Sequence, residues 1–364
     1  MTSWNDPARI AALVEAVNGA GSTTLIGNLT TEMRMQSFDG IAFPVSLSTR
    51  QNPLNCYISD PVAALTDYAR FELHALPNRA ARTGAGALIS LVHPLVAASG
   101  LGHQVQVNDW LVSTNPVPPL RAATAAAIRD DLTASYPDRA VVMRSLNEGH
   151  DAASLAALRD AGFTLMPMRQ VWLTDPQACA ETRDLRRDLR ALERTGFAAK
   201  AGDAFTDADF ARAARLYGQL YLEKYTPLNP QYTPRYIKAM QRAGVLTLTG
   251  WYDPAGEMVA VGGLFRNGPV LTQPLLGYDL ARPASDGLYR LVTAHAFRAA
   301  REARLQLNSS AGAARFKRLR GARPAIEYTA IYAAHLPRRQ RLAIGAIAEI
   351  LRKVGVPLIR RYQL

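Results

Sequence analysis

The sequence predicts a mixed α/β fold (an α+β mixed sheet) made of two halves with similar element order. Strand-like segments rich in β-branched and aromatic residues alternate with segments in which Ala and Leu recur at helical spacing. The order returns in the second half, and 364 residues suffice for two domains of about 150 residues each. A hydrophobic content of 48% with 20% charged residues is typical of a protein with a buried core. The recurring order suggests an internal duplication, although residue identities do not show one.

In the first half, the clearest segments follow one another as strand, helix, strand, helix, strand. Asp151 is placed to cap the second helix and Gly162 to end it. The expected ranges, in order, are the strand region 103–119, helix 120–138, strand 140–146, helix 151–163 and strand 168–175. A charged amphipathic helix at 181–196 then links the halves, with its leucines on one face.

The second half repeats this alternation with a three-strand meander in its middle. Thr206 or Asp207 caps its first helix, and Pro234 stands in the first turn of the second. The expected ranges are helices 206–225 and 233–244, strands 245–253, 257–268 and 269–279, helix 287–303, strand 304–310, a short helix in 311–321, strand 324–335, and a basic amphipathic helix in 341–364. We therefore expect domains at 1–178 and 179–340, followed by the C-terminal helix at 341–364, which docks on the body by default.

The positive charge is concentrated near the end of the sequence. The chain carries +12 overall, but residues 282–364 hold 17 basic and 4 acidic residues, a balance of +13. Such a field can bind nucleic acid, a phosphate-bearing cofactor, an acidic protein or an anionic membrane. The alternative is a general preference for arginine, since 37 of the 42 basic residues are Arg.

Several other site classes are not expected. Cys56 and Cys179 stand alone, and the six histidines lack metal-ligand spacing, so neither a disulfide framework nor a metal site is predicted. There is no G-x-S-x-G motif for a serine nucleophile. No signal peptide and no transmembrane segment are expected, which makes a cytoplasmic location the expectation. The oligomeric state is left open.

The second half resembles the GNAT acyltransferase fold, and residues 181–335 resemble the second domain of FemABX-like transferases and of BioF2-like acyltransferases. The resemblance is carried by a strand ending at Tyr278, the helix-opening turn "ASDGLYRL", a strand ending at Asn308, and the pair Phe316–Lys317 followed by "GA". It implies tandem GNAT-like N-acyltransferase domains, since FemABX-like proteins pair two of them and use aminoacyl-tRNA as donor. The first half matches in element order only.

One departure bears on the donor. GNAT enzymes that use CoA carry Q/R-x-x-G-x-G/A before the helix that follows the fourth strand, and its backbone N–H groups hold the pyrophosphate. Here the corresponding stretch is "RPASDGLYRL", with the single glycine Gly287 and an acid at Asp286. An acid at a helix start disfavours a bound anion. We therefore expect no cofactor, and no CoA bound in the usual way.

The predicted catalytic residues are Lys317, Tyr278, Asp279 and Asn308. The resemblance implies that Lys317 stabilises charge developing on the donor carbonyl or a nearby phosphate. Tyr278 could protonate a leaving group and Asp279 could accept the proton of the acceptor amine. Structural roles are the alternatives: a solvated basic helix around Lys317 and a strand-end turn at Asp279.

The predicted binding residues fall into two groups. The donor group is Arg315, Arg318, Arg320, Gly287, Tyr289 and Ser309. The acceptor group is Gln273, then Tyr221, Glu223, Tyr225 and Asn229 from a loop rich in Tyr and Pro, and Asn108, Asp109, Trp110 and Ser113 from the first half. An aromatic surface cluster and a capped edge strand are the structural alternatives for the last two sets.

The sequence thus favours an acyltransferase that forms an amide or ester. The preferred reaction moves an aminoacyl group from aminoacyl-tRNA to an amine or hydroxyl of a small-molecule or cell-envelope acceptor. The first alternative is an N-acyltransferase that uses an acyl-CoA or the thioester of an acidic acyl-carrier protein. The second is a non-catalytic GNAT pair that binds RNA or a protein partner. Acceptor identity and aminoacyl specificity lie beyond the sequence.

Overall fold

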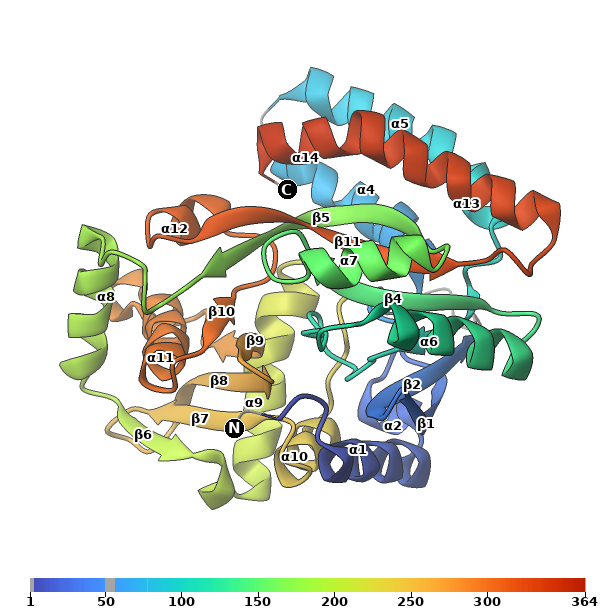
Figure 1. The fold of residues 1–364 in the computed structure, drawn as a ribbon. Coiled ribbons are helices and arrows are strands. Elements are labelled where there is room, and N and C mark those ends of the chain that lie inside the picture. Colours follow the sequence, from blue (N-terminus) through green and yellow to red (C-terminus); the bar gives the residue numbers. More distant parts are fainter. Residues whose placement is uncertain (1–2, 50–55, 77, 364) are drawn as a thin grey trace.

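One twisted sheet of eleven strands runs through the computed structural model, which describes residues 3–49, 56–76 and 78–363 (Figure 1). Its strands are β1 (Thr31–Phe38), β2 (Ile41–Thr49), β3 (His103–Val107), β4 (Ala140–Asn147), β5 (Thr164–Thr174), β6 (Ala198–Ala201), β7 (Thr247–Tyr252), β8 (Met258–Asn267), β9 (Val270–Tyr278), β10 (Gln306–Asn308) and β11 (Arg323–Tyr332). Their order is β1-β2-β3-β4-β11-β5-β10-β9-β8-β7-β6. The predicted mixed α/β class is confirmed.

The two halves of the chain exchange strands at the centre of this sheet. β11, from the second half, lies between β4 and β5, while β5, from the first half, lies between β11 and β10. Outward from β11 and outward from β5, the pairings match: one antiparallel pair, one parallel pair (β3 with β4, β9 with β10), then antiparallel pairs. The strand topology therefore repeats about the central β5–β11 pair, although the residues do not.

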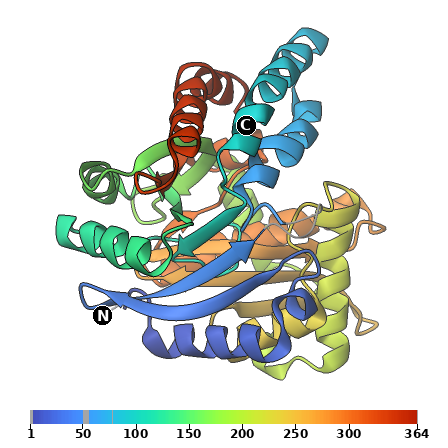
Figure 2. The ribbon, with the colours of Figure 1, turned by 90° about the vertical axis from the view of Figure 1, so that its right-hand side faces the viewer.

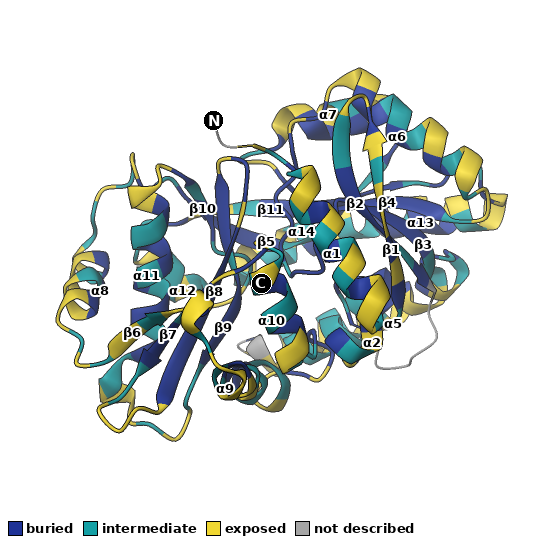
Figure 3. Cartoon of the chain, turned by 90° about the horizontal axis from the view of Figure 1, so that it is seen from below, coloured by how far each residue is buried: buried dark blue, intermediate teal, exposed yellow. Residues whose placement is uncertain are grey.

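Helices cover both faces of each side of the sheet (Figures 1 and 3). On the side of the first half these are α6 (Ala122–Ser135) and α7 (Ala152–Asp160) on one face, with α5 (Arg79–Ala98) and α13 (Arg338–Ile350) on the other. On the side of the second half, α9 (Asp207–Gly218) and α10 (Pro234–Arg242) face α8 (Arg183–Glu193) and α11 (Leu288–Glu302) across the strands. α1 (Pro7–Ala20) packs on β1 and β2, and α2 (Ser22–Leu25) lies between α1 and α10 in the same core. Alternate strand residues supply the two cores, as expected for a sheet buried on both sides.

Local signals explain why the predicted second half is recovered so closely. Thr206 caps α9 through a capping box, and Thr233 caps α10 just before Pro234. The meander turns at Asn267-Gly268, where Gly268 has φ +56°, a conformation that favours glycine. The short helix α12 (Ala314–Arg318) follows β10 as predicted.

The first hundred residues contain elements that were not predicted. They are α1, α2, the β1–β2 hairpin, the short helices α3 (Pro61–Ala63) and α4 (Ala69–Glu72), and α5. Within the described residues, α5 alone is long and apolar enough, by length and composition only, to cross a membrane. Of the residues in its most apolar 18-residue window, 11% are buried inside the protein.

The C-terminal segment forms α13 and α14 (Val356–Tyr362), joined by a π-helical turn at Leu351–Gly355. α13 buries Ala343, Ile344, Ile347 and Ala348 in the core that it shares with α5. Figure 2 shows α13 and α14 standing beside α5 on the same side of the sheet. The expected helix is therefore present, and it packs on the body of the protein.

Candidate functional site

A cavity of about 820 Å³ lies where the two halves of the chain meet. Its floor comes from β5, β9, β10 and β11 at the centre of the sheet, and its walls come from α4, α5, α8, α11, α12 and α14. Among the predicted site residues it is lined by Ser113, Tyr221, Tyr225, Asn229, Gln273, Tyr278, Tyr289, Ser309, Lys317 and Arg320. The structure thus brings together residues that are up to 207 positions apart, counting from Ser113 to Arg320.

The polar floor of the cavity is a buried ion pair between the two exchanged strands. Arg169 of β5 and Glu327 of β11 stand directly opposite each other in the strand register. The guanidinium donates to both carboxylate oxygens, at 2.7 and 3.2 Å, and also to the Ser113 carbonyl at 2.8 Å and Thr114 Oγ1 at 3.1 Å. Burial by itself would lower the pKa of Arg169, but the Glu327 carboxylate more than offsets this, so the pKa is raised and the charge is fixed.

Lys317 reaches the cavity from α12. Its ammonium donates to the carbonyl oxygens of Ser309 at 2.6 Å, Ser310 at 3.2 Å and Ala311 at 2.8 Å. Burial, with a smaller contribution from the nearby Arg169 charge, lowers the pKa of Lys317 to about 7. The lysine therefore both fixes the turn after β10 and places a titratable positive charge at the cavity wall.

The turn that Lys317 holds is tied to the first half as well. Ser310 has φ +59°, and its hydroxyl accepts a 3.0 Å hydrogen bond from Thr114. Its carbonyl accepts from the Trp172 N–H at 3.1 Å, while the Ser309 N–H donates to the Trp172 carbonyl at 2.9 Å. The turn is therefore hydrogen-bonded to both halves of the chain, and Ser309 lines the cavity as predicted.

Aromatic rings form the wall on the side of the second half. The ring centroids of Tyr278 and Tyr289 are 6.2 Å apart, and Tyr289 stands edge-on to Phe316 at 4.8 Å. Tyr221 and Tyr225 continue this wall, with centroids 6.0 Å apart. Burial raises the pKa of Tyr278 above its usual range, so its hydroxyl remains protonated at neutral pH.

Arg320 lines the cavity but is already paired. Its guanidinium donates to Asp188 of α8 through Nε at 2.6 Å and lies 3.4 Å from the centroid of the Phe316 ring. Arg315 and Arg318 are exposed on the outer side of α12 and do not line the cavity. This corrects the expectation that all three arginines hold a donor inside the site, since Arg320 is committed to a buried carboxylate and the other two face outward.

Two predicted residues at the ends of central strands, Asp279 and Asn308, have structural partners instead of facing the cavity, and a third predicted residue, Glu223, lies in the π-helical segment Gln219–Glu223. Asp279 accepts from Arg212 at 2.8 Å and from the Ala281 N–H at 3.0 Å, so it closes a turn. Asn308 is buried and accepts from the Ser310 N–H at 2.9 Å. Glu223 is exposed outside the cavity. The roles expected for these residues at the site are therefore wrong, because their side chains do not reach it.

The predicted acceptor residues Asn108, Asp109 and Trp110 are also misplaced. The exposed fraction of each of these residues is at most 1%. Asn108 accepts from the Trp110 indole at 3.2 Å, and Asp109 accepts from the Ser46 hydroxyl at 2.5 Å. Their polar atoms satisfy a tight turn that has positive φ at Asn108, and only Ser113 from this stretch lines the cavity.

The start of α11 does not fit a CoA pyrophosphate. Gly287 adopts φ +64° and precedes the helix, but it does not line the cavity. Asp286 stands beside it and accepts from Arg282 at 2.9 Å. A carboxylate at the point where the anion would lie opposes phosphate binding, so we derive no reaction step through this cofactor.

Three charged residues that line the cavity, Arg144, Arg169 and Glu327, were not among the predicted site residues. Arg144 and Arg169 are the lone charges of β4 and β5, and Glu327 is the buried charge of β11, whose other charged residue, Arg323, is exposed at the start of the strand. Charges are rarely buried unless paired, so such residues in predicted core strands signal a buried polar site. Arg144 also lines the cavity, with its guanidinium 6.0 Å from the centroid of the Tyr57 ring.

Comparison with known proteins shows which solved structures share this fold. No family model matches the chain, and no curated protein matches it in sequence. The structure of L-PGS from Bacillus licheniformis aligns over 96% of this chain and 98% of that one, with TM-score 0.54 and 11% identity. The crystal structure of FemX aligns over 94% of this chain and 96% of that one, with TM-score 0.55 and 10% identity. The chain therefore has the fold of these two proteins along nearly its whole length, and the predicted resemblance is confirmed for the fold.

Proposed function

We propose that this protein is an acyltransferase that moves an aminoacyl group from aminoacyl-tRNA to an amine or hydroxyl of its acceptor. The observation that carries the proposal is the position of Lys317, which places a titratable cation in the wall of a cavity built by both halves. The likeness of the fold to FemX and L-PGS supports it. The start of α11, which is unsuited to pyrophosphate, disfavours CoA as the donor.

The reaction needs no covalent enzyme intermediate. The acceptor nitrogen or oxygen attacks the carbonyl carbon of the aminoacyl ester, and the carbonyl oxygen gains negative charge. The positive charge of Lys317 stabilises this oxygen through space, since its three N–H groups donate to the carbonyl oxygens of Ser309, Ser310 and Ala311. The bond to the ribose oxygen then breaks. The proton lost by the acceptor is the one that the departing ribose oxygen requires, and the protonated Tyr278 hydroxyl is suited to relay it. No net proton is gained or lost.

The shape of the cavity favours an acceptor with an apolar portion. Away from the charged floor, the cavity is walled by aliphatic residues of α5 and α14, among them Leu88, Ile89, Val92, Leu358 and Ile359. Burying hydrocarbon against such a wall stabilises a complex by about 25 cal/mol per Å². We therefore propose a cell-envelope or other amphiphilic acceptor, whose reactive amine or hydroxyl would lie near the floor.

A panel of donors tests this function. Purified protein is incubated with charged tRNAs, acyl-CoAs or acyl-carrier proteins and a mixture of amphiphilic acceptors, and products are identified by mass spectrometry. We expect product from charged tRNA alone, abolished by ribonuclease. Transfer from a thioester after ribonuclease treatment would overturn the proposal, and no product with any donor would favour a binding protein.

A substitution tests the assignment of Lys317. Removing a donor that stabilises an oxyanion typically costs about 100- to 1,000-fold in rate, so we expect a loss of this size in Lys317→Ala. The matched control is Lys353→Ala, since Lys353 is exposed and lies outside the cavity. Equal rates for the two variants would show that the assignment is wrong.

A further inference from the structure

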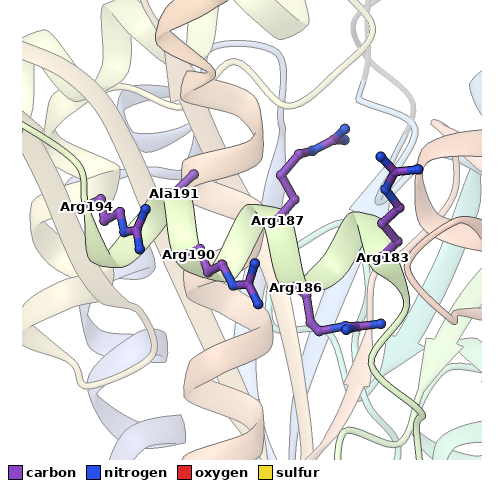
Figure 4. Close-up of a pocket in the computed structure, with 6 residues that line it drawn as sticks. All are labelled: Arg183, Arg186, Arg187, Arg190, Ala191 and Arg194. Carbon is purple, nitrogen blue, oxygen red and sulfur yellow. The ribbon is translucent and has the colours of Figure 1, made fainter.

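Helix α8 carries a row of arginines on the face that points away from the protein. Arg183, Arg186, Arg187 and Arg190 lie on the helix, with Arg194 just after it, and together with Ala191 they line a shallow depression (Figure 4). At about 100° per residue, the five arginines fall within one face roughly 100° wide. Leu185, Asp188 and Leu192 are buried on the opposite face. We call the five residues the arginine face.

Most of the positive charges on the arginine face have no carboxylate partner within the part of the chain that the structure describes. Arg187 pairs with Asp184 at 2.8 Å. Within the described residues, no carboxylate lies at ion-pair distance from the other four arginines, and all five are exposed. Like charges three or four residues apart destabilise a helix, so the row costs stability in the free protein. An anionic partner would remove that cost.

The arginine face stands directly behind the cavity. Leu185 and Asp188, on the inner side of α8, line the cavity wall, and a helix is about 10–12 Å across. Thr182 at the start of α8 donates to the Leu319 carbonyl at 2.7 Å, and Asp188 holds Arg320. These contacts place α8 against α12 and its exposed arginines, at one end of the molecule (Figure 1).

We propose that the arginine face binds the phosphate backbone of the donor tRNA and so delivers its aminoacylated end to the cavity. This inference rests on the proposed function. Arginine presents a planar fork that matches phosphate oxygens, and arginines one helical turn apart can follow successive phosphates. No large apolar side chain interrupts the arginine face, which disfavours insertion into a membrane.

The test compares two double variants with the same change of charge. Arg186→Gln/Arg190→Gln alters the arginine face, and Arg338→Gln/Arg339→Gln removes two exposed arginines of α13. Binding of uncharged tRNA is measured by fluorescence anisotropy between 50 and 200 mM NaCl. Two lost phosphate contacts reduce the slope of log K against log salt by about 1.4 to 1.8. If affinities converge at 1 M salt, this corresponds to roughly 25- to 60-fold weaker binding at 100 mM.

We expect the α8 variant alone to show this loss, with a matching rise in KM for aminoacyl-tRNA and a kcat within about twofold of the parent. An unchanged salt slope in the α8 variant would overturn the inference, and so would an equal loss in the α13 variant, which would indicate diffuse attraction. Weakened binding of an acidic carrier protein in place of tRNA would assign the arginine face to that partner. If the parent protein itself transfers only from thioesters, the proposed function fails. If it transfers from tRNA and the α8 variant keeps its KM, only this inference fails.

Discussion

Replacing Glu327 by glutamine tests whether the charged floor of the cavity is held together by compensation of buried charge. The Glu327 side chain is 4% exposed and that of its partner Arg169 is 20% exposed. The substitution nearly preserves the shape of the side chain, but it removes the negative charge and replaces one acceptor oxygen by an NH2 donor. No anionic group then remains against Arg169, whose other acceptors, the Ser113 carbonyl and Thr114 Oγ1, are neutral.

The expected cost is a loss of about 3 kcal/mol in the free energy of unfolding. Breaking a buried ion pair by removing one partner costs about 3–5 kcal/mol, and the two remaining acceptors place this case at the lower end. The entropy of unfolding is about 2.1 cal/mol/K per residue, which for 364 residues gives roughly 0.76 kcal/mol/K. A loss of 3 kcal/mol therefore lowers Tm by about 4 °C.

The assay is thermal unfolding followed by circular dichroism, with Glu349→Gln as the control. Glu349 forms the same type of pair with Arg352, but the two side chains are 46% and 64% exposed, so only a small loss is expected there. Equal shifts in Tm for the two variants would refute the reasoning. Replacing both partners, as in Arg169→Met/Glu327→Leu, should restore much of the stability, since a buried pair can often be exchanged for apolar residues.

The remaining predictions concern a glycine, the titration of the lysine and the α8–α12 contact. Gly277→Ala places a Cβ 2.6 Å from a backbone nitrogen of α9 and should lower the free energy of unfolding in urea by about 1–3 kcal/mol. In the control Gly84→Ala the new Cβ has no atom within 4 Å, so the free energy of unfolding should rise slightly. Equal effects of the two substitutions would contradict the packing argument. With a pKa of about 7 for Lys317, kcat should fall as pH rises through 7 because the charged form is lost, and a rate that rises instead would indicate a general base. Asp188→Asn leaves the buried Arg320 without its carboxylate and should cost about 3 kcal/mol in urea unfolding, while a cost below about 1 kcal/mol would show that the contact is dispensable.

The second half of the fold could be predicted from sequence because its signals are local. Thr206 and Thr233 mark the helix starts, and Asn267-Gly268 marks a hairpin turn, each through chemistry confined to a few residues. The segment 107–116 gave the opposite result. Its polar residues were expected to line a groove, yet Asp109 is fully buried, because a polar cluster that satisfies its own turn has the same composition as one that faces a ligand.

The exchange of β5 and β11 could not be predicted in this way. The residues around Glu327 carry no local signal that they pair with β4 and β5. Arg169 and Glu327 are 158 positions apart in the sequence, and the pairing of such distant strands depends on the whole sheet. The lone charges in apolar strands were nevertheless visible. Arg169 is the lone charge of β5, and Glu327 stands among the apolar residues of β11, whose other charge, Arg323, begins the strand. A buried charge needs a partner of opposite sign, which indicates that the two strands are neighbours.

The strand exchange also explains why the site lies where it does. Because β11 pairs with β4 and β5 pairs with β10, the strands of the two halves are hydrogen-bonded into one continuous sheet. The Arg169–Glu327 pair lies at the centre of this sheet. The turn after β10 is then held from the second half by Lys317 and from the first half by Thr114. Neither half alone supplies a complete wall and floor, so the geometry of the cavity depends on the folding of both halves together.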